Sequence, residues 1–185
     1  MNCSRANSDE SVLVLLDLQP SVLKAIPNSD ELLARSAFLL RVAQLLEVPV
    51  VQSEQNPDGL GRTDARLQAL LQKPARVEKT SFSAAASSAF MAALEATKRR
   101  QVVVSGIETH ICVAQTLCEL SDRGFETFAC VDAIGARSAD RHAAGLDRLR
   151  DAGVTVAHSE SIVYEWLGDS THLKFRDVLK IVKES

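Results

Sequence analysis

A carboxylate, an ammonium and a thiol each lie beyond a short apolar run in this sequence. Asp17 and Lys79 directly follow two of these runs, and Cys112 lies shortly after a third. A thiolate is a strong nucleophile, a neighbouring carboxylate can take the thiol proton and later return it, and a cation stabilises both charged forms. These residue types predict attack by Cys112 on a carbonyl carbon, with Asp17 as general base and acid and Lys79 as its electrostatic partner.

Cys112 is predicted to lie in the first turn of a helix over residues 109–122. The helix dipole is positive at that end and a nearby ammonium adds to it, so we expect the pKa of the Cys112 thiol to be below its ordinary value. The same turn presents backbone N–H groups without helical partners. Such groups are suited to hold the oxyanion that forms when a thiolate attacks a carbonyl.

Each of these residues also has an ordinary structural interpretation. A cysteine in a helix is most often a small core residue, an Asp after a strand most often caps a turn, and a Lys is most often a solvated surface charge. We assign Cys118 and Cys130 to the core on this basis. We disfavour His110 as a partner of Cys112, because residues two apart on a helix point to different sides.

Short apolar runs alternate with longer amphipathic stretches along the whole chain. The predicted strands cover residues 12–16, 48–51, 76–78, 102–104, 126–131 and 154–157. The predicted helices cover residues 28–46, where Asn28 and Glu31 suggest a capping box, 64–71, 84–97, 109–122, 138–151 and 172–182. This order predicts an α/β fold with a doubly wound, Rossmann-like parallel sheet. Ligands bind such sheets at the carboxyl ends of the strands, where all three reactive residues fall.

Length and composition restrict the class of protein. A chain of 185 residues, 46% of them apolar, predicts a single domain over residues 1–185, with residues 1–10 as a flexible N-terminus. The net charge of −3 provides no attraction for nucleic acid or an anionic membrane. No apolar run approaches the length of a membrane span, the cysteines form no CxxC pair, and residues 1–5 resemble no secretion signal, so we expect a cytoplasmic protein.

Several common catalytic signatures are missing from the sequence. There is no GxGxxG after the first predicted strand, and no GxxxxGK[ST], GxSxG or HExxH motif. The four histidines are widely scattered and include no pair spaced four apart on a helix. We therefore expect neither a metal nor a nucleotide cofactor.

Three segments, in chain order, carry the pattern of a known family. They are Val14-Leu15-Leu16-Asp17-Leu18-Gln19, Glu78-Lys79-Thr80-Ser81-Phe82 and Gly106-Ile107-Glu108-Thr109-His110-Ile111-Cys112-Val113. Together with residues 131–133 and 159–175, the latter containing Leu167-Gly168-Asp169, they make the chain resemble the isochorismatase-like cysteine hydrolases over nearly its whole length. The C-terminal stretch is similar to that of the isochorismatase domain-containing subgroup.

The resemblance implies a sheet of six parallel strands between two layers of helices, and an Asp–Lys–Cys triad at Asp17, Lys79 and Cys112. It also implies a cis peptide bond between Ile107 and Glu108, which directs the Glu108 N–H toward an oxyanion hole shared with the N–H of Cys112. Family members assemble as dimers, tetramers or larger rings, so we expect a homo-oligomer.

Departures from the family pattern restrict the substrate. Nicotinamidases of the family bind a metal through an Asp-x-His motif and a further His, whereas residues 51–57 here read Val-Gln-Ser-Glu-Gln-Asn-Pro. The metal ligands are missing, which disfavours nicotinamide. Isochorismatases proper do not need the thiol, so the presence of Cys112 favours acyl transfer from an amide. We expect Gln19, Glu54, Phe82 and His110 to line the substrate pocket.

Two functions of different classes follow. The first is a metal-independent cysteine hydrolase that cleaves a small amide, ureide or related acyl compound through a thioester on Cys112. The alternative is a binding or scaffold protein that keeps the fold and the triad but turns nothing over, and acts through its oligomer surface. The complete triad favours the enzyme.

Overall fold

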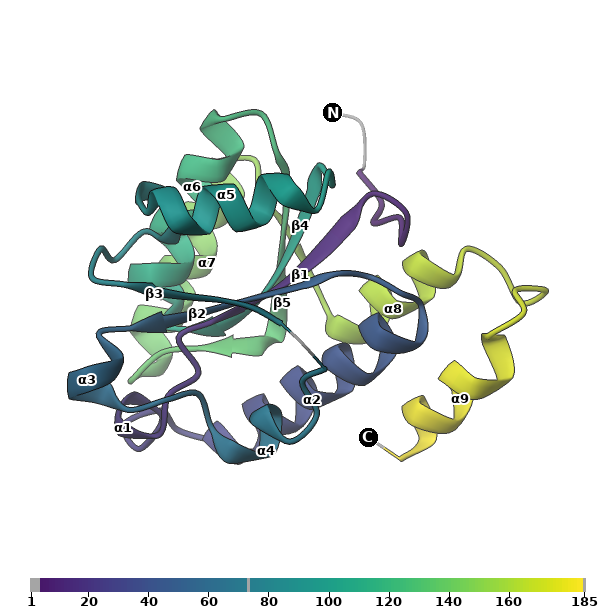
Figure 1. The fold of residues 1–185 in the computed structure, drawn as a ribbon, viewed down its shortest axis with the longest axis horizontal. Helices are drawn as coiled ribbons and strands as arrows, with labels where there is room; N and C mark the ends of the chain where they lie inside the picture. The colour runs from purple at the N-terminus through teal and green to yellow at the C-terminus, as the bar shows by residue number, and fades with distance from the viewer. Residues whose placement is uncertain (1–3, 73, 185) are drawn as a thin grey trace.

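The computed structural model describes residues 4–72 and 74–184, and its centre is a twisted parallel sheet (Figure 1). The strands within these residues are β1 (Ser11–Leu16), β2 (Val50–Gln55), β3 (Ala75–Lys79), β4 (Gln101–Ile107), β5 (Glu126–Gly135) and β6 (Thr155–Ala157). They pair in the order β3-β2-β1-β4-β5-β6, and every pairing is parallel. The predicted doubly wound, six-stranded α/β fold is confirmed.

Helices cover both faces of the sheet. In chain order they are α1 (Pro20–Leu23), α2 (Ser29–Leu45), α3 (Pro57–Leu60), α4 (Ala65–Gln68), η1 (Ala84–Ala86), α5 (Ser88–Ala96), η2 (Thr109–Val113), α6 (Ala114–Asp122), α7 (Ala139–Asp151), α8 (Ser159–Leu167) and α9 (Phe175–Lys183). Figure 1 shows α5, α6 and α7 on one side of the sheet and α2, α8 and α9 on the other. The molecule therefore has three layers.

The central strand β1 shows why an uninterrupted apolar run becomes a strand here. All six of its residues are buried, because helices cover both faces of a parallel sheet. Leu13 and Leu15 pack into the core beneath α2, α8 and α9. Val12, Val14 and Leu16 pack into the core beneath α5, α6 and α7. The alternation of side chains along one strand thus supplies both hydrophobic cores.

Several local features differ from the prediction. Strand β2 extends to Gln55 rather than ending at residue 51. The Ala-rich helix is interrupted at Ser87, whose hydroxyl accepts a hydrogen bond from the Phe90 N–H and so begins α5. Helix α8 was not predicted, although its buried residues recur at helical spacing. Asn28 makes no side-chain cap, because its backbone is left-handed, with φ of 56°.

The N-terminal segment is packed rather than free over the residues that the structure describes. Ala6 is buried, and its N–H donates to the Glu165 carboxylate at 2.7 Å. The Asn7 N–H donates to the Gln101 side chain, also at 2.7 Å. These hydrogen bonds join residues 6 and 7 to the folded body of the chain. Among the described residues, no helix has the length and apolar character needed to cross a membrane.

Candidate active site

Asp17 and Lys79 meet at the carboxyl edge of the sheet. Asp17 follows β1 and Lys79 is the last residue of β3, and their Oδ2 and Nζ atoms lie 2.7 Å apart. Asp17 adopts a left-handed conformation with φ of 56°, which Asp tolerates better than most residues. Only 3% of Asp17 and 4% of Lys79 are exposed, so this ion pair is shielded from solvent.

Strand β2, which lies between β1 and β3, provides further hydrogen bonds to this ion pair. The Ser53 hydroxyl donates to Asp17 Oδ1 at 2.7 Å, so both carboxylate oxygens carry a hydrogen bond. Lys79 Nζ also donates to Gln55 Oε1 at 2.7 Å and to the Ser81 carbonyl at 3.1 Å. Ser53 and Gln55 are two positions apart on β2 and therefore face the same side of the sheet.

Cys112 reaches the same site from the segment that follows β4. It is the fourth residue of η2, a wide helical turn that continues directly into α6. Two glycines allow this approach. A Cβ atom at Gly106 would lie 2.2 Å from the Leu16 carbonyl oxygen, and one at Gly145 would lie 2.9 Å from the His110 nitrogen. These positions let β4 lie against β1 and let α7 lie against η2.

The electrostatic environment of Cys112 differs from the sequence-based expectation. Burial, followed by the neighbouring Asp17 charge, raises the pKa of the Cys112 thiol to about 12. The Lys79 ammonium and a hydrogen bond from the Glu108 N–H act in the opposite direction but do not outweigh them. The prediction of a lowered pKa was wrong, because the sequence shows neither the burial of the sulfur nor its closeness to Asp17. The thiol of the free protein is therefore protonated at neutral pH.

The Ile107–Glu108 peptide bond is cis, and the Glu108 N–H is directed at the Cys112 sulfur. The Glu108 side chain is also ordered by the segment after β5. Its Oε2 atom accepts hydrogen bonds from the Arg137 N–H at 3.0 Å and from Arg137 Nε at 3.1 Å. Glu108 thus connects the end of β4 to the beginning of α7, and so fixes the backbone that precedes Cys112.

A cavity of about 140 Å³ opens onto these groups. Its lining residues are Asp17, Val22, Gln55, Leu60, Phe82, Ile107, Glu108, Ile111 and Cys112. Phe82 lies at the cavity with 59% of its surface exposed, which is unusual for a phenylalanine. The cavity therefore combines a reactive polar end with apolar walls.

Two of the expected pocket residues support loops instead of lining this cavity. The Gln19 amide donates to the carbonyls of Gln55 and Gly61, and it accepts from the Gln55 N–H. Glu54 is fully buried and accepts from the Thr63 N–H at 2.9 Å and from Arg62 at 2.9 Å. Burial raises the pKa of Glu54, but the bonds from Thr63 and Arg62 outweigh it and lower the pKa overall.

His110, also expected at the pocket, is not among the residues that line it. Its Nδ1 atom is buried and has no hydrogen-bond partner in the described part of the chain. The structure therefore brings Asp17, Lys79, Cys112, Glu108 and Phe82 together, and it places Gln19, Glu54 and His110 outside the cavity.

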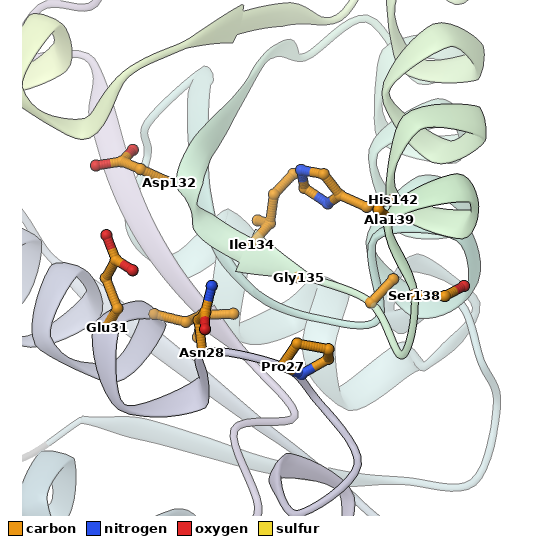
Figure 2. Close-up of a pocket in the computed structure, with 11 residues that line it drawn as sticks. Pro27, Asn28, Glu31, Asp132, Ile134, Gly135, Ser138, Ala139 and His142 are labelled. Carbon is orange, nitrogen blue, oxygen red and sulfur yellow. The ribbon is translucent and has the colours of Figure 1, made fainter.

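A larger cavity of about 360 Å³ lies further along the same edge, between the beginnings of α2 and α7. Figure 2 shows the His142 ring and the Asn28 amide directed into it, with the Glu31 and Asp132 carboxylates at one side. Asp132 is already bonded by Arg35 and by Ser159. None of the candidate catalytic side chains lines this cavity, so the smaller cavity is the better candidate for the active site.

Ser53 and Gln55 are site residues that were not predicted from the sequence. Extending the second strand by four residues would have placed them, by the alternation of side chains, on the side that faces Asp17 and Lys79. Within the described residues, no three His, Cys, Asp or Glu side chains gather as a metal site.

Comparison with known proteins agrees with this architecture. The family description "Isochorismatase domain" matches residues 11–161. The isochorismatase domain-containing protein 2 of Bos taurus is 37% identical over 175 residues, which cover 94% of this chain and 83% of that protein. The isochorismatase domain-containing protein 1 of Salmo salar is 36% identical over 177 residues, covering 95% of this chain and 62% of that protein.

Two solved structures extend the comparison. A structure described as the MAR1 ribonuclease of Caenorhabditis elegans superposes with a TM-score of 0.91 at 32% identity, over 97% of this chain and 93% of that one. The YcaC gene product of Escherichia coli, described as an octameric hydrolase of unknown specificity, has a TM-score of 0.88 at 19% identity, over 100% of this chain and 98% of that one. The second likeness concerns the fold alone.

Proposed function

Since this chain belongs to the isochorismatase family, whose fold points to hydrolase activity, we propose that it is a cysteine hydrolase of a small amide, ureide or related acyl compound. The observation that carries the proposal is the buried Asp17–Lys79 ion pair, with its 2.7 Å contact, at the cavity that also contains the Cys112 sulfur. A buried ion pair costs solvation free energy, so its presence beside a thiol calls for a functional reason.

The reaction begins with proton transfer from the Cys112 thiol to Asp17. The resulting thiolate attacks the substrate carbonyl carbon, and the N–H groups of Glu108 and Cys112 bind the oxyanion. Asp17 then gives its proton to the leaving amine, the C–N bond breaks, and an acyl thioester remains on Cys112. Asp17 next takes a proton from water, which attacks the thioester, and the proton returns to the Cys112 sulfur as the acid product leaves.

The raised pKa of Cys112 is compatible with this sequence. Loss of the thiol proton to solvent would place a second negative charge beside Asp17 in a buried site, which is costly. Transfer of the same proton to Asp17 leaves the total charge of the site unchanged, and Lys79 then faces the thiolate instead of the carboxylate. The thiolate therefore forms within the site, together with protonated Asp17, rather than as a free anion.

The dimensions and charge of the site support a small substrate. A cavity of about 140 Å³ with apolar walls fits a short acyl group better than a polymer. One relative of known structure is described as a ribonuclease. The net charge of −3 does not favour RNA as the substrate of this chain, because it supplies no attraction for a phosphate backbone.

Assembly into a homo-oligomer is part of the same proposal. It is supported by the family membership and by the octameric description of one structural relative. Native mass spectrometry of the purified protein measures the number of subunits directly. A monomer at micromolar concentration would contradict this part of the proposal without affecting the chemistry.

A screen for turnover tests the proposed function. The wild-type protein is incubated with small amides, ureides and esters and with an RNA oligonucleotide, and ammonia, acid and RNA fragments are measured. We expect hydrolysis of at least one amide or ureide, abolished in Cys112→Ala and retained in the matched control Cys118→Ala. Hydrolysis that survives in Cys112→Ala, or cleavage of RNA alone, would contradict the proposal.

A further inference from the structure

We propose that Gln55 is a positioning residue that holds the Lys79 ammonium with an uncharged oxygen, so that the positive charge of Lys79 stays available to Asp17 and Cys112. This inference rests on the proposed function, because it assigns a role within the same site. It concerns the electrostatics of Lys79 and Cys112, so it can be tested without a substrate.

The contacts of Gln55 join it to the Lys79 ammonium and to the segment after β3. Its Oε1 atom accepts from Lys79 Nζ at 2.7 Å, and its Nε2 atom donates to the Thr80 carbonyl at 2.7 Å. Its own N–H is fixed by Gln19 Oε1 at 2.8 Å. Gln55 also lines the cavity that contains Cys112. Both polar atoms of the Gln55 side-chain amide are therefore hydrogen-bonded, and the residue also borders the cavity that contains Cys112.

The lack of charge on Gln55 matters because Lys79 must change its anionic partner during the reaction. Among the residues that the structure describes, Asp17 is the one carboxylate bonded to Lys79. The other acceptors are uncharged, namely Gln55 Oε1, the Ser81 carbonyl and the more distant Phe82 carbonyl. When Asp17 takes the thiol proton, these neutral acceptors keep Lys79 in place while its charge serves the new thiolate. A second carboxylate at position 55 would bind that charge permanently.

An electrostatic role for Gln55 predicts an order of effects opposite to that of a purely structural role. Gln55→Glu nearly preserves the shape and the acceptor, but adds a negative charge beside Lys79 and close to the sulfur. Gln55→Met removes the strong acceptor but adds no charge. A structural role alone makes Gln55→Met the more harmful change, whereas the electrostatic role makes Gln55→Glu the more harmful one.

Alkylation by iodoacetamide, a small uncharged reagent, provides the measurement, because its rate follows the thiolate population of Cys112. The rate is measured at pH 8 by peptide mass spectrometry. We expect Gln55→Glu to lower it by at least about 10-fold and Gln55→Met by about 3-fold. The matched controls Gln44→Glu and Gln44→Met alter a glutamine bonded to the Leu70 carbonyl, outside the site, and should leave the rate unchanged.

The outcomes separate the two proposals. A wild-type rate in Gln55→Glu, or a lower rate in Gln55→Met than in Gln55→Glu, overturns the inference even if the protein is an active hydrolase. The expected order supports it even if the turnover screen finds no substrate. If Gln55→Glu does not fold, as judged by circular dichroism, the pair Gln55→Asn and Gln55→Asp repeats the comparison with a shorter side chain, and the Asp variant must then be the slower of the two.

Discussion

Replacing Asp17, the proposed general base and acid, by its amide should lower the pKa of the Cys112 thiol while abolishing turnover. In Asp17→Asn, the carboxylate that raises the pKa of the Cys112 thiol is gone, and Lys79 loses its bonded anion and can pair with the thiolate instead. The same change removes the carboxylate that is proposed to take and return the proton. Thiolate formation and catalysis should therefore change in opposite directions.

The expected magnitude follows from the contact between the two groups. Asp17 is within hydrogen-bonding reach of the Cys112 sulfur, and two unit charges about 4 Å apart interact by roughly 4 kcal/mol at an effective dielectric constant of 20. Some of this free energy is screened through the open cavity, so we expect a gain of about 3 kcal/mol for the thiolate. One pKa unit corresponds to about 1.4 kcal/mol, so the thiolate population at a given pH should rise about 100-fold.

The assay is the pH dependence of iodoacetamide alkylation, read separately for each cysteine by peptide mass spectrometry. Cys130, a buried thiol whose pKa burial raises strongly, serves as an unreactive reference in the same sample. Asp64→Asn is the matched control, since Asp64 caps α4 and bonds Arg66 away from the cavity. An unchanged or slower alkylation of Cys112 in Asp17→Asn would refute the view that Asp17 controls the thiol, as would undiminished turnover.

Three further changes test other parts of the structure. Phe82→Ala removes an exposed aromatic wall of the cavity, so KM, measured by steady-state kinetics, should rise about 10-fold. The thermal midpoint, measured by calorimetry, should change little because the side chain is exposed. An unchanged KM would show that Phe82 does not contact the substrate. Gly106→Ala should lower the free energy of unfolding, measured by urea titration, by more than about 3 kcal/mol, because the new Cβ would lie 2.2 Å from the Leu16 carbonyl oxygen. A decrease below about 1 kcal/mol would be inconsistent with that clash. Burial lowers the pKa of His142, so the folded state binds fewer protons than the unfolded state, and His142 destabilises the protein as the pH falls below 6.5, the ordinary pKa of histidine. The urea midpoints at pH 7 and pH 5 should therefore differ less in His142→Gln than in wild type. An equal difference in the two proteins would contradict this role of His142.

The fold could be predicted from the sequence because each local signal agreed with the global arrangement. Runs such as Val12–Leu16 are too short and too uniformly apolar for a surface helix, and their alternation with amphipathic segments leaves few options besides a parallel sheet. The same pattern predicts that Asp17 and Lys79 lie at the carboxyl edge of the sheet, because each lies at the end of a strand. Helix α8 escaped prediction because it begins directly after the short strand β6.

The details of the site were harder to predict because they depend on distances across the sheet. Glu54 and Gln55 are adjacent in sequence, but the pleat of β2 directs one to the loop at Thr63 and the other to Lys79. The strand was predicted to end before both residues, so the two side chains could not be assigned to different sides of the sheet. The raised pKa of Cys112 likewise depends on burial and on the position of Asp17, neither of which is local to the helix that carries the thiol.

The most direct test of the central claim is to trap the acyl group on the nucleophile. Wild-type protein is mixed rapidly with p-nitrophenyl acetate, quenched in acid and analysed by intact-protein and peptide mass spectrometry. We predict one acetyl group per chain, on the peptide that contains Cys112, and none on that peptide in Cys112→Ala. In Asp17→Asn the acetyl group should form faster, because the thiolate population is larger, and should be lost more slowly, because no carboxylate takes the proton from water. An acetyl group found only on other residues, or an unchanged adduct in Cys112→Ala, would contradict nucleophilic catalysis by this thiol.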